Sequence, residues 1–441
     1  MAQTRTRTGI PRTVRKNTML LASSQAFSGA GGQMVPTLAP VLVVQMINNA
    51  SLAGIGTSIT GLSRLIIAYP IGRLTDAFGR RAGVVLGLLL TGCGAGIIGA
   101  SAILQNFPGF LFGLLVMGLG TGAVQQLRVA AADMYPPNRR AEGLGLVLTG
   151  SLVGAVFGPI LIRASELVAP GFDMEPIALA WFFVPVAVLG SITLIMQVRP
   201  DPKEIASNLQ AYYPDYVPPP AVQGTPEKVS IVTFIKEYPK LTAFITMFSV
   251  QGNMNMMMAM TSLALKEHGF ALSAISLSVA IHVIGMFGFS IPIGKLGDRI
   301  GRRNTMLLGV LVAAMGTWLI VATPHYWIIT FGTFLVGLGW SGGNISATAL
   351  YADTTPPAAR GRVIGANDTF TASASIGMPI VGGVVIQTLG LQALGFFGMA
   401  LMVPALFYLL RLRERYPGSY EGPGRKQPAP MDSQSGVSML S

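Results

Sequence analysis

The chain has 441 residues, of which 51% are hydrophobic and 11% are charged, and its formal net charge is +12. A soluble domain usually carries about 25% charged residues, so this composition excludes a water-facing surface over most of the chain. The single cysteine, Cys93, excludes a disulfide framework.

Apolar blocks of membrane-spanning length, about 20 residues each, follow one another along the chain. They predict twelve transmembrane helices at 18–47, 51–71, 82–103, 108–133, 142–167, 177–198, 240–265, 272–293, 304–323, 326–351, 363–387 and 393–411. A long, proline-rich connection at 199–239 divides them six and six.

These blocks predict an all-α integral membrane protein of two six-helix bundles, at 18–198 and 240–412. The remaining segments are predicted as a basic cytosolic N-tail (1–17), a cytosolic linker (199–239) and a disordered cytosolic tail (413–441).

Basic residues gather in alternate loops. Most of the Lys and Arg lie in the N-tail, in the loops 72–81, 134–141, 199–239, 294–303 and 352–362, and in the C-tail. The loops on the other side hold only Lys266. Because Lys and Arg favour the cytosolic side of a membrane, this asymmetry predicts that both termini are cytosolic. It also accounts for the net charge without a nucleic-acid partner.

Two short strings occur once in each half. "GRLTDAFGRR" at 72–81 shares six of ten letters with "GKLGDRIGRR" at 294–303, and "ADMYPPNRRAEGLG" at 132–145 matches "ADTTPPAARGRVIG" at 352–365. The two offsets, 222 and 220 residues, are nearly equal. A duplicated six-helix unit explains both, and transporters with parallel repeats are built in this way.

The first pair of strings resembles the loop signature G-x-L-x-D-x-x-G-R-R/K of the major facilitator superfamily of secondary transporters, and the resemblance extends over about 15–412. It implies a two-bundle carrier that works by alternating access. The gating residues that it implies are Gly72, Asp76, Gly79, Arg80, Arg81, Gly294, Asp298, Gly301, Arg302 and Arg303. It further implies that Asp76 meets Arg362, and Asp298 meets Arg140, across the boundary between the halves while the cytosolic side is closed.

The predicted fifth helix carries part of the family's antiporter signature, at Gly145, Gly154, Gly158 and Pro159. Ile162 and Arg163 replace its last two glycines. Glycines at this spacing allow another helix to approach closely, so tight packing and an antiport role remain alternatives.

Polar side chains within the apolar blocks are costly unless they face a cavity or a partner. The resemblance implies a central cavity lined by helices 1, 4, 7 and 10. The predicted cavity residues are Gln25, Gln33, Arg64, Gln125, Gln126, Arg128, Gln251, Asn253, Asn255, Trp340 and Asn344. The alternatives for Arg64 and Arg128 are structural pairing and, for Arg64, extension to the membrane interface.

Three titratable side chains are candidates for proton coupling: Glu166, Asp368 and His282. The alternatives are an ion pair of Glu166 with Arg163 at the outer mouth, a hydrogen-bond acceptor for Asp368 and a packing histidine for His282. The sequence has no P-loop, no metal-ligand spacing and no hydrolytic triad, so neither an enzyme nor a cofactor or metal is predicted.

We therefore predict secondary active, proton-coupled transport of a small organic solute across the inner or plasma membrane by a monomer. Efflux of drug-like or metabolite compounds is favoured by the partial antiporter signature. Uptake of a vitamin or small organic acid is the alternative, because an acidic residue expected in helix 1 of drug antiporters is missing. A membrane sensor that does not transport is the third reading.

Overall fold

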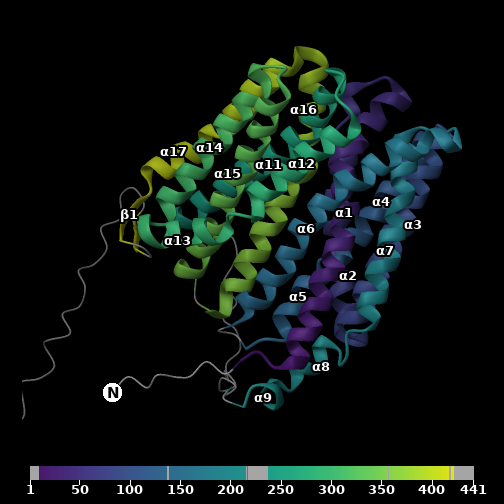
Figure 1. Cartoon of the computed structure of the whole chain (residues 1–441). Helices are drawn as coiled ribbons and strands as arrows, with labels where there is room; N and C mark the ends of the chain where they lie inside the picture. Colours follow the sequence, from purple (N-terminus) through teal and green to yellow (C-terminus); the bar gives the residue numbers. More distant parts are fainter. Residues whose placement is uncertain are drawn as a thin grey trace, which may run out of the picture.

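The computed structural model describes residues 9–136, 139–214, 216, 237–355, 357–416 and 419–421. Two helical bundles stand side by side, one built from the first half of the chain and one from the second (Figure 1). The predicted all-α, two-bundle fold is confirmed.

The N-terminal bundle contains six spans, of which the fourth is divided at Gln125. Its helices are α1 (Arg12–Ile47), α2 (Ile55–Phe78), α3 (Arg80–Ile103), α4 (Phe107–Val124), α5 (Gln126–Asp133), α6 (Arg140–Val168) and α7 (Pro176–Met196). Their core is apolar and includes the fully buried side chains of Phe110 and Trp181.

The C-terminal bundle repeats this arrangement. Its helices are α11 (Tyr238–Glu267), α12 (Leu272–Phe287), α13 (Ser290–Ile300), α14 (Arg302–Ala322), α15 (Tyr326–Thr354), α16 (Pro357–Ala400) and α17 (Val403–Arg411). Gly390, at φ 84°, turns the chain within α16 and so separates the last two spans. Phe244 and Tyr351 pack edge to face in this bundle's core, with ring centroids 5.4 Å apart.

Among the described residues, ten helices are long and apolar enough to cross a membrane. Two of the twelve predicted spans are missing from this count. One of the ten, Arg362–Arg411, holds two spans because of the turn at Gly390. The other missing span is α11, which has 30 residues but carries several amide side chains that lower its hydropathy.

Some element boundaries differ from the prediction. Helix α1 begins at Arg12, six residues before the predicted first span, because a helix can continue beyond the apolar layer. The linker begins with two short helices, α8 (Pro202–Ser207) and α9 (Leu209–Tyr212). The tail predicted to be disordered begins with two antiparallel strands, β1 (Arg413–Tyr416) and β2 (Ser419–Glu421). Residues 217–236 and 422–441 lie outside the described residues.

The two ends of the helices define two sides of the molecule. We call the side with Arg12 and Arg411 the termini side, and the side with the α1–α2 connection the far side (toward the lower left and the upper right of Figure 1, respectively). The short helix η1 (Ala50–Leu52) lies on the far side, as does η2 (Ala169–Phe172).

The two halves are in contact near the far side. The Ala50 amide donates to Gln387 Oε1 at 3.1 Å, and Ser273 donates from its amide and its hydroxyl to Glu166 at 3.0 and 2.8 Å. Gly54 lies directly against the Pro379 carbonyl group, where a Cβ would overlap it. Between the halves, toward the termini side of these contacts, lies a cavity.

Candidate substrate cavity and gating loops

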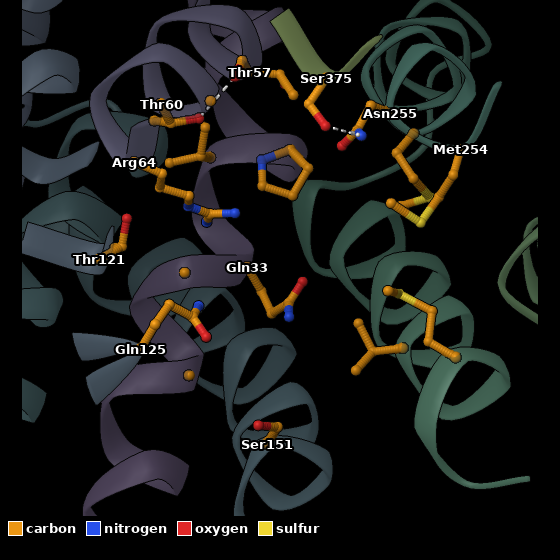
Figure 2. Close-up of a pocket in the computed structure, with 18 of the residues that line it drawn as sticks. Gln33, Thr57, Thr60, Arg64, Thr121, Gln125, Ser151, Met254, Asn255 and Ser375 are labelled. Atoms are coloured by element: carbon orange, nitrogen blue, oxygen red, sulfur yellow. Dashed lines mark hydrogen bonds between the residues drawn. The ribbon is translucent and has the colours of Figure 1, made fainter. Parts of the chain in front are cut away.

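The cavity has a volume of about 340 Å³ and is lined by both halves (Figure 2). Helices α1 to α6 supply one wall, and α11, α12, α15 and α16 supply the other. The predicted residues that line it are Gln25, Gln33, Arg64, Gln125, Arg128, Gln251, Asn255 and Trp340. Side chains more than 300 residues apart in the sequence therefore share one site.

Three residues of the predicted cavity set do not line this cavity. Asn253 is fully buried and donates from Nδ2 to Thr317 Oγ1 of α14 at 2.8 Å. Gln126 and Asn344 are half-buried on α5 and α15. On a helix, residues two apart point to nearly opposite faces, which is why Asn253 faces away while Gln251 and Asn255 face the cavity.

The wall from the C-terminal half is a closed hydrogen-bond network. Trp340 Nε1 donates to Gln251 Oε1 at 2.7 Å, and Gln251 Nε2 donates to Ser375 Oγ at 3.3 Å. Asn255 Nδ2 donates to the same Ser375 oxygen at 3.0 Å. Because the polar ends of Gln251 and Trp340 bind each other, the amide and the indole ring are held in fixed positions.

The wall from the N-terminal half carries two arginines. Arg64 extends from α2 toward the space between Gln33 and Gln125 (Figure 2). A large part of the Arg64 and Gln125 side chains is accessible, although both lie within the bundle, because they face the cavity. Arg128 lies on α5, one helical turn beyond Gln125, and is half-buried.

Most of the small polar and apolar side chains that line the cavity were not predicted from the sequence. Thr57, Thr60, Thr121 and Ser151 line the first wall, and Ser375 lines the second. Ser and Thr are common in transmembrane helices, where they bond to the backbone one turn away, so their presence alone carries little signal. Met254, Met258, Met286 and Phe287 complete the second wall.

The three proton-coupling candidates lie in three different places. His282 lines the cavity, and its Nδ1 lies 2.7 Å from the Thr333 carbonyl oxygen. Because a carbonyl can only accept, Nδ1 carries the hydrogen and Nε2 is left as an acceptor. Glu166 pairs with Arg163 at 3.1 Å and accepts from Ser273 on the far side. Asp368 is exposed on α16 and is not part of the cavity lining.

The two duplicated strings of each half meet on the termini side. Arg80 Nε donates to Asp133 Oδ2 at 2.9 Å, and Arg80 Nη1 donates to Asp76 Oδ1 at 3.2 Å. In the second half Arg302 binds Asp353, at 3.3 Å, and Asp298. This link was not predicted. The nearly equal offsets of the two string pairs were the signal that could have indicated it.

A second carboxylate binds each gating loop through the backbone. Asp201 accepts from the amides of Arg80 and Arg81 at 3.0 and 3.1 Å, at the start of α3. Glu414 accepts from the amides of Arg302 and Arg303 at 3.0 and 2.8 Å, at the start of α14. A carboxylate at a helix N-terminus satisfies amides that have no partner in the helix and favours the helix dipole.

Gly79 and Gly301 make room for these carboxylates. Both have φ of +91°, a conformation that side chains with a Cβ rarely adopt. A Cβ at Gly79 would lie 2.7 Å from Asp201 Oδ2, and one at Gly301 would lie 2.5 Å from Glu414 Oε2. By contrast, at Gly72 and Gly294, the first glycines of the strings, a Cβ would have no atom of the described residues within 4 Å beyond its own helix turn.

The acidic residues of the gating strings are exposed. The side chains of Asp76 and Asp298 are 73% and 71% exposed and pair with the arginine four residues on. Arg140 and Arg362, at the termini-side ends of α6 and α16, are exposed as well. The predicted contacts of Asp76 with Arg362 and of Asp298 with Arg140 therefore stay predictions for another conformation.

The predicted packing motif lies on α6. A Cβ at Gly154 would lie 2.6 Å from the Ala26 carbonyl oxygen, so this glycine allows α6 to approach α1. Gly158 lies 3.6 Å or more from its neighbours, Gly145 has open space, and Pro159 stands inside the helix. Close helix packing thus rests on Gly154 within this motif.

Comparison with known proteins places the chain in a family. The model of the Major Facilitator Superfamily matches twice, over residues 21–248 and 241–439. The chain is 28% identical to the uncharacterized MFS-type transporter YdeG of Bacillus subtilis, over 90% of this chain and 93% of that protein. It is 27% identical to the riboflavin transporter RfnT of Brucella anthropi, with coverage of 80% and 85%. It is 23% identical to the multi-drug resistance efflux pump PmrA of Streptococcus pneumoniae, with coverage of 88% and 93%.

The crystal structure of the nucleoside transporter NupG has the same fold, with a TM-score of 0.68, 14% identity and coverage of 90% of this chain and 98% of that one. The resemblance inferred from the duplicated strings is confirmed by the twofold family match, which covers both bundles. The chain is a multi-pass membrane protein that belongs to the Major Facilitator Superfamily of transporters.

Proposed function

We propose that the protein is a secondary active carrier that exports a small organic solute by alternating access. The observation that carries this proposal is the cavity at the boundary of the two halves, closed toward the far side by the contacts of Ser273 with Glu166 and of Ala50 with Gln387. A site between two rigid bundles is exposed to one side at a time when the bundles rock against each other.

The termini side is assigned to the cytosol. The loops on this side carry most of the Lys and Arg, and this bias sets the orientation of a membrane protein. With that orientation, the cavity is in its inward-facing state. The exposed Asp76 and Asp298 fit this state, because their predicted partners in the other half would bind them only when the cytosolic side closes.

Proton coupling is assigned to His282. It lines the cavity, and with Nδ1 held by the Thr333 carbonyl its Nε2 is the atom that accepts a proton. Glu166 serves a different purpose in this proposal, because both of its oxygens bind Ser273 of the other half. It closes the far side, while Asp368 remains outside the cavity.

Export is favoured by the partial antiporter signature on α6 and by the relationship to a protein named as a multidrug efflux pump. Uptake of a nutrient is the second candidate. The fixed platform of Gln251, Asn255 and Trp340 suits a flat polar molecule, and another relative is named as a riboflavin transporter.

The test compares metabolites in cells that lack or overexpress the gene, inside the cells and in the medium. Export predicts a solute that is depleted in overexpressing cells and enriched in their medium, and uptake predicts the reverse. A profile with no difference on either side would refute carrier function.

Coupling is tested with the solute so identified, in liposomes with an imposed pH gradient. We expect His282→Asn to abolish accumulation driven by this gradient but to retain exchange of solute for solute. The matched control is His325→Asn, since His325 is exposed at the far-side start of α15. If accumulation by His282→Asn equals that of the wild type, coupling through His282 is wrong.

A further inference from the structure

We propose that the carried solute is an amphipathic organic anion, whose acidic group binds between Arg64 and Arg128 and whose apolar part lies against α11 and α12. The inference rests on the proposed function in one respect: it takes the cavity between the halves to be the substrate site.

The charged residues of the cavity are basic. Arg64 and Arg128 both line it, whereas no Asp or Glu among the described residues does. Neither arginine has a carboxylate within salt-bridge distance in the part of the chain that the structure describes. The two positive charges line one cavity and therefore repel each other. Unpaired like charges held within a membrane protein are costly, and an anion between them would offset that cost.

The wall from the N-terminal half also holds hydrogen-bond donors without partners. Arg128 Nε, Thr57 Oγ1 and Ser151 Oγ are buried and have no partner among the described residues. All three residues belong to the N-terminal half and line the cavity. A buried donor without a partner costs free energy, which a ligand that accepts hydrogen bonds would recover. A carboxylate, sulfonate or phosphate ester offers several strong acceptor oxygens to such donors.

The opposite wall, from the C-terminal half, is mainly apolar. Met254, Met258, Met286 and Phe287 give it an apolar surface. Its polar residues are largely satisfied by one another, since Trp340 binds Gln251 and both Gln251 and Asn255 bind Ser375. Methionine side chains adapt to the shape of an apolar or aromatic group, so this wall suits the uncharged body of a ligand.

Together the two walls define the solute. One is cationic and has free donors, and the other is apolar with a flat amide and indole platform. The volume, about 340 Å³, is near the lower end of the usual range for ligand pockets of about 300–1,000 Å³. A compound with one acidic group and a small ring system fits both walls. An organic cation would place its charge against two arginines.

The test is binding to the purified full chain in lipid nanodiscs, measured by calorimetry. The probes share one aromatic body and differ in charge: 2-naphthoate, 2-naphthylmethanol and 2-naphthylmethylammonium. Acetate serves as an anion without the apolar body. We expect 2-naphthoate to bind about tenfold or more tightly than each of the other three, because hydrogen bonds to charged groups are the stronger ones.

Variants then locate the site. Arg64→Gln and Arg128→Gln should each weaken 2-naphthoate about tenfold, with little effect on 2-naphthylmethanol. Arg64→Lys, which keeps the charge, should retain part of the preference. Arg73→Gln is the matched control, because Arg73 lies on the same helix but outside the cavity. Gel filtration verifies that each variant is folded.

Two results would overturn the anion assignment: equal or tighter binding of the alcohol or the ammonium compound, or no binding of any probe. If both glutamine variants bind 2-naphthoate as tightly as the wild type, the assignment of the anion site to Arg64 and Arg128 is wrong. Transport is measured separately, as movement of labelled 2-naphthoate into liposomes. Binding as expected without any transport would refute the carrier function and leave the anion site standing. Transport of the neutral or cationic probe in preference to the anion would refute the anion site and leave the carrier function standing.

Discussion

Replacing Gly79 by alanine should damage the protein far more than the same change at Gly72, although both are glycines of one string. Gly79 has φ 91° and ψ 163°, a region used almost only by glycine, and forcing another residue there costs about 1–3 kcal/mol. The new Cβ would also lie 2.7 Å from Asp201 Oδ2, so the carboxylate must move away from the amides of Arg80 and Arg81. Losing a helix cap costs about 1 kcal/mol.

The sum is about 2–4 kcal/mol of lost stability for Gly79→Ala. Gly72 lies inside α2, and a Cβ there would meet none of the described residues within 4 Å beyond its own helix turn, so Gly72→Ala should be neutral or stabilise the helix by about 0.5–1 kcal/mol. The assay is thermal unfolding of the purified protein, followed by tryptophan fluorescence. We expect Tm to fall by several degrees for Gly79→Ala only.

A double-mutant cycle separates the two contributions. If the clash with Asp201 is real, Gly79→Ala should cost less in an Asp201→Ala background, where only the backbone strain of about 1–3 kcal/mol remains. Equal Tm values for the two glycine variants would refute the conformational argument. An unchanged effect of Gly79→Ala in the Asp201→Ala background would refute the contact with the carboxylate.

Two further predictions concern the balance between conformations, each measured as the distance between spin labels on the two halves. Asp76→Asn should leave folding intact, favour the state open on the termini side and slow transport, because its predicted contact with Arg362 needs the charge; normal transport by this variant would contradict a role for that contact. Glu166→Gln should favour the state open on the far side, by about five- to tenfold, because the bonds to Ser273 lose their charge; unchanged far-side distances would contradict this role.

The fold could be predicted from the sequence because its signals are long and repeated. Uncharged blocks of about 20 residues indicate membrane spans whether or not the packing of the helices is known. Two duplicated strings then show that the chain is divided into two halves. The start of α1 at Arg12 was not predicted, because it lies outside the apolar block. Hydropathy locates the apolar part of a helix, and Arg12 and Arg15 lie beyond it.

The site was less predictable, and α11 shows why. Gln251, Asn253 and Asn255 look alike in the sequence, yet only the first and third line the cavity. The helical period separates residues two apart onto opposite faces, but which face meets the cavity depends on packing against α14, where Thr317 accepts from Asn253. The hydroxyl side chains of the cavity could not be identified at all, since each resembles many others that bond to their own helix.

The carboxylates that cap the gating loops were missed because they lie far away along the chain. Asp201 is 120 residues or more from the amides that it binds, and Glu414 is more than 110 residues from its own. Both follow the sixth helix of their half, in segments with the composition of a linker or a tail. Composition describes a segment as a whole and cannot indicate a single side chain that folds back onto a helix terminus.

Each gating loop has contacts that stay within its own half and one contact that can be exchanged for a partner in the other half. This combination allows the loop to respond when the two halves move relative to each other. Arg80 is held by Asp133 and its backbone amide by Asp201, all within one half, so these bonds persist when the halves rock as rigid bodies. Asp76 is the exposed member: its side chain is 73% accessible, and among the described residues its carboxylate is bound by Arg80. An exposed ion pair contributes only about 0–1 kcal/mol, so Asp76 can leave it at little cost for a partner in the other half. Each half thus holds its loop through carboxylates that stay within that half, and leaves one exposed carboxylate that can bind the other half when the termini side closes.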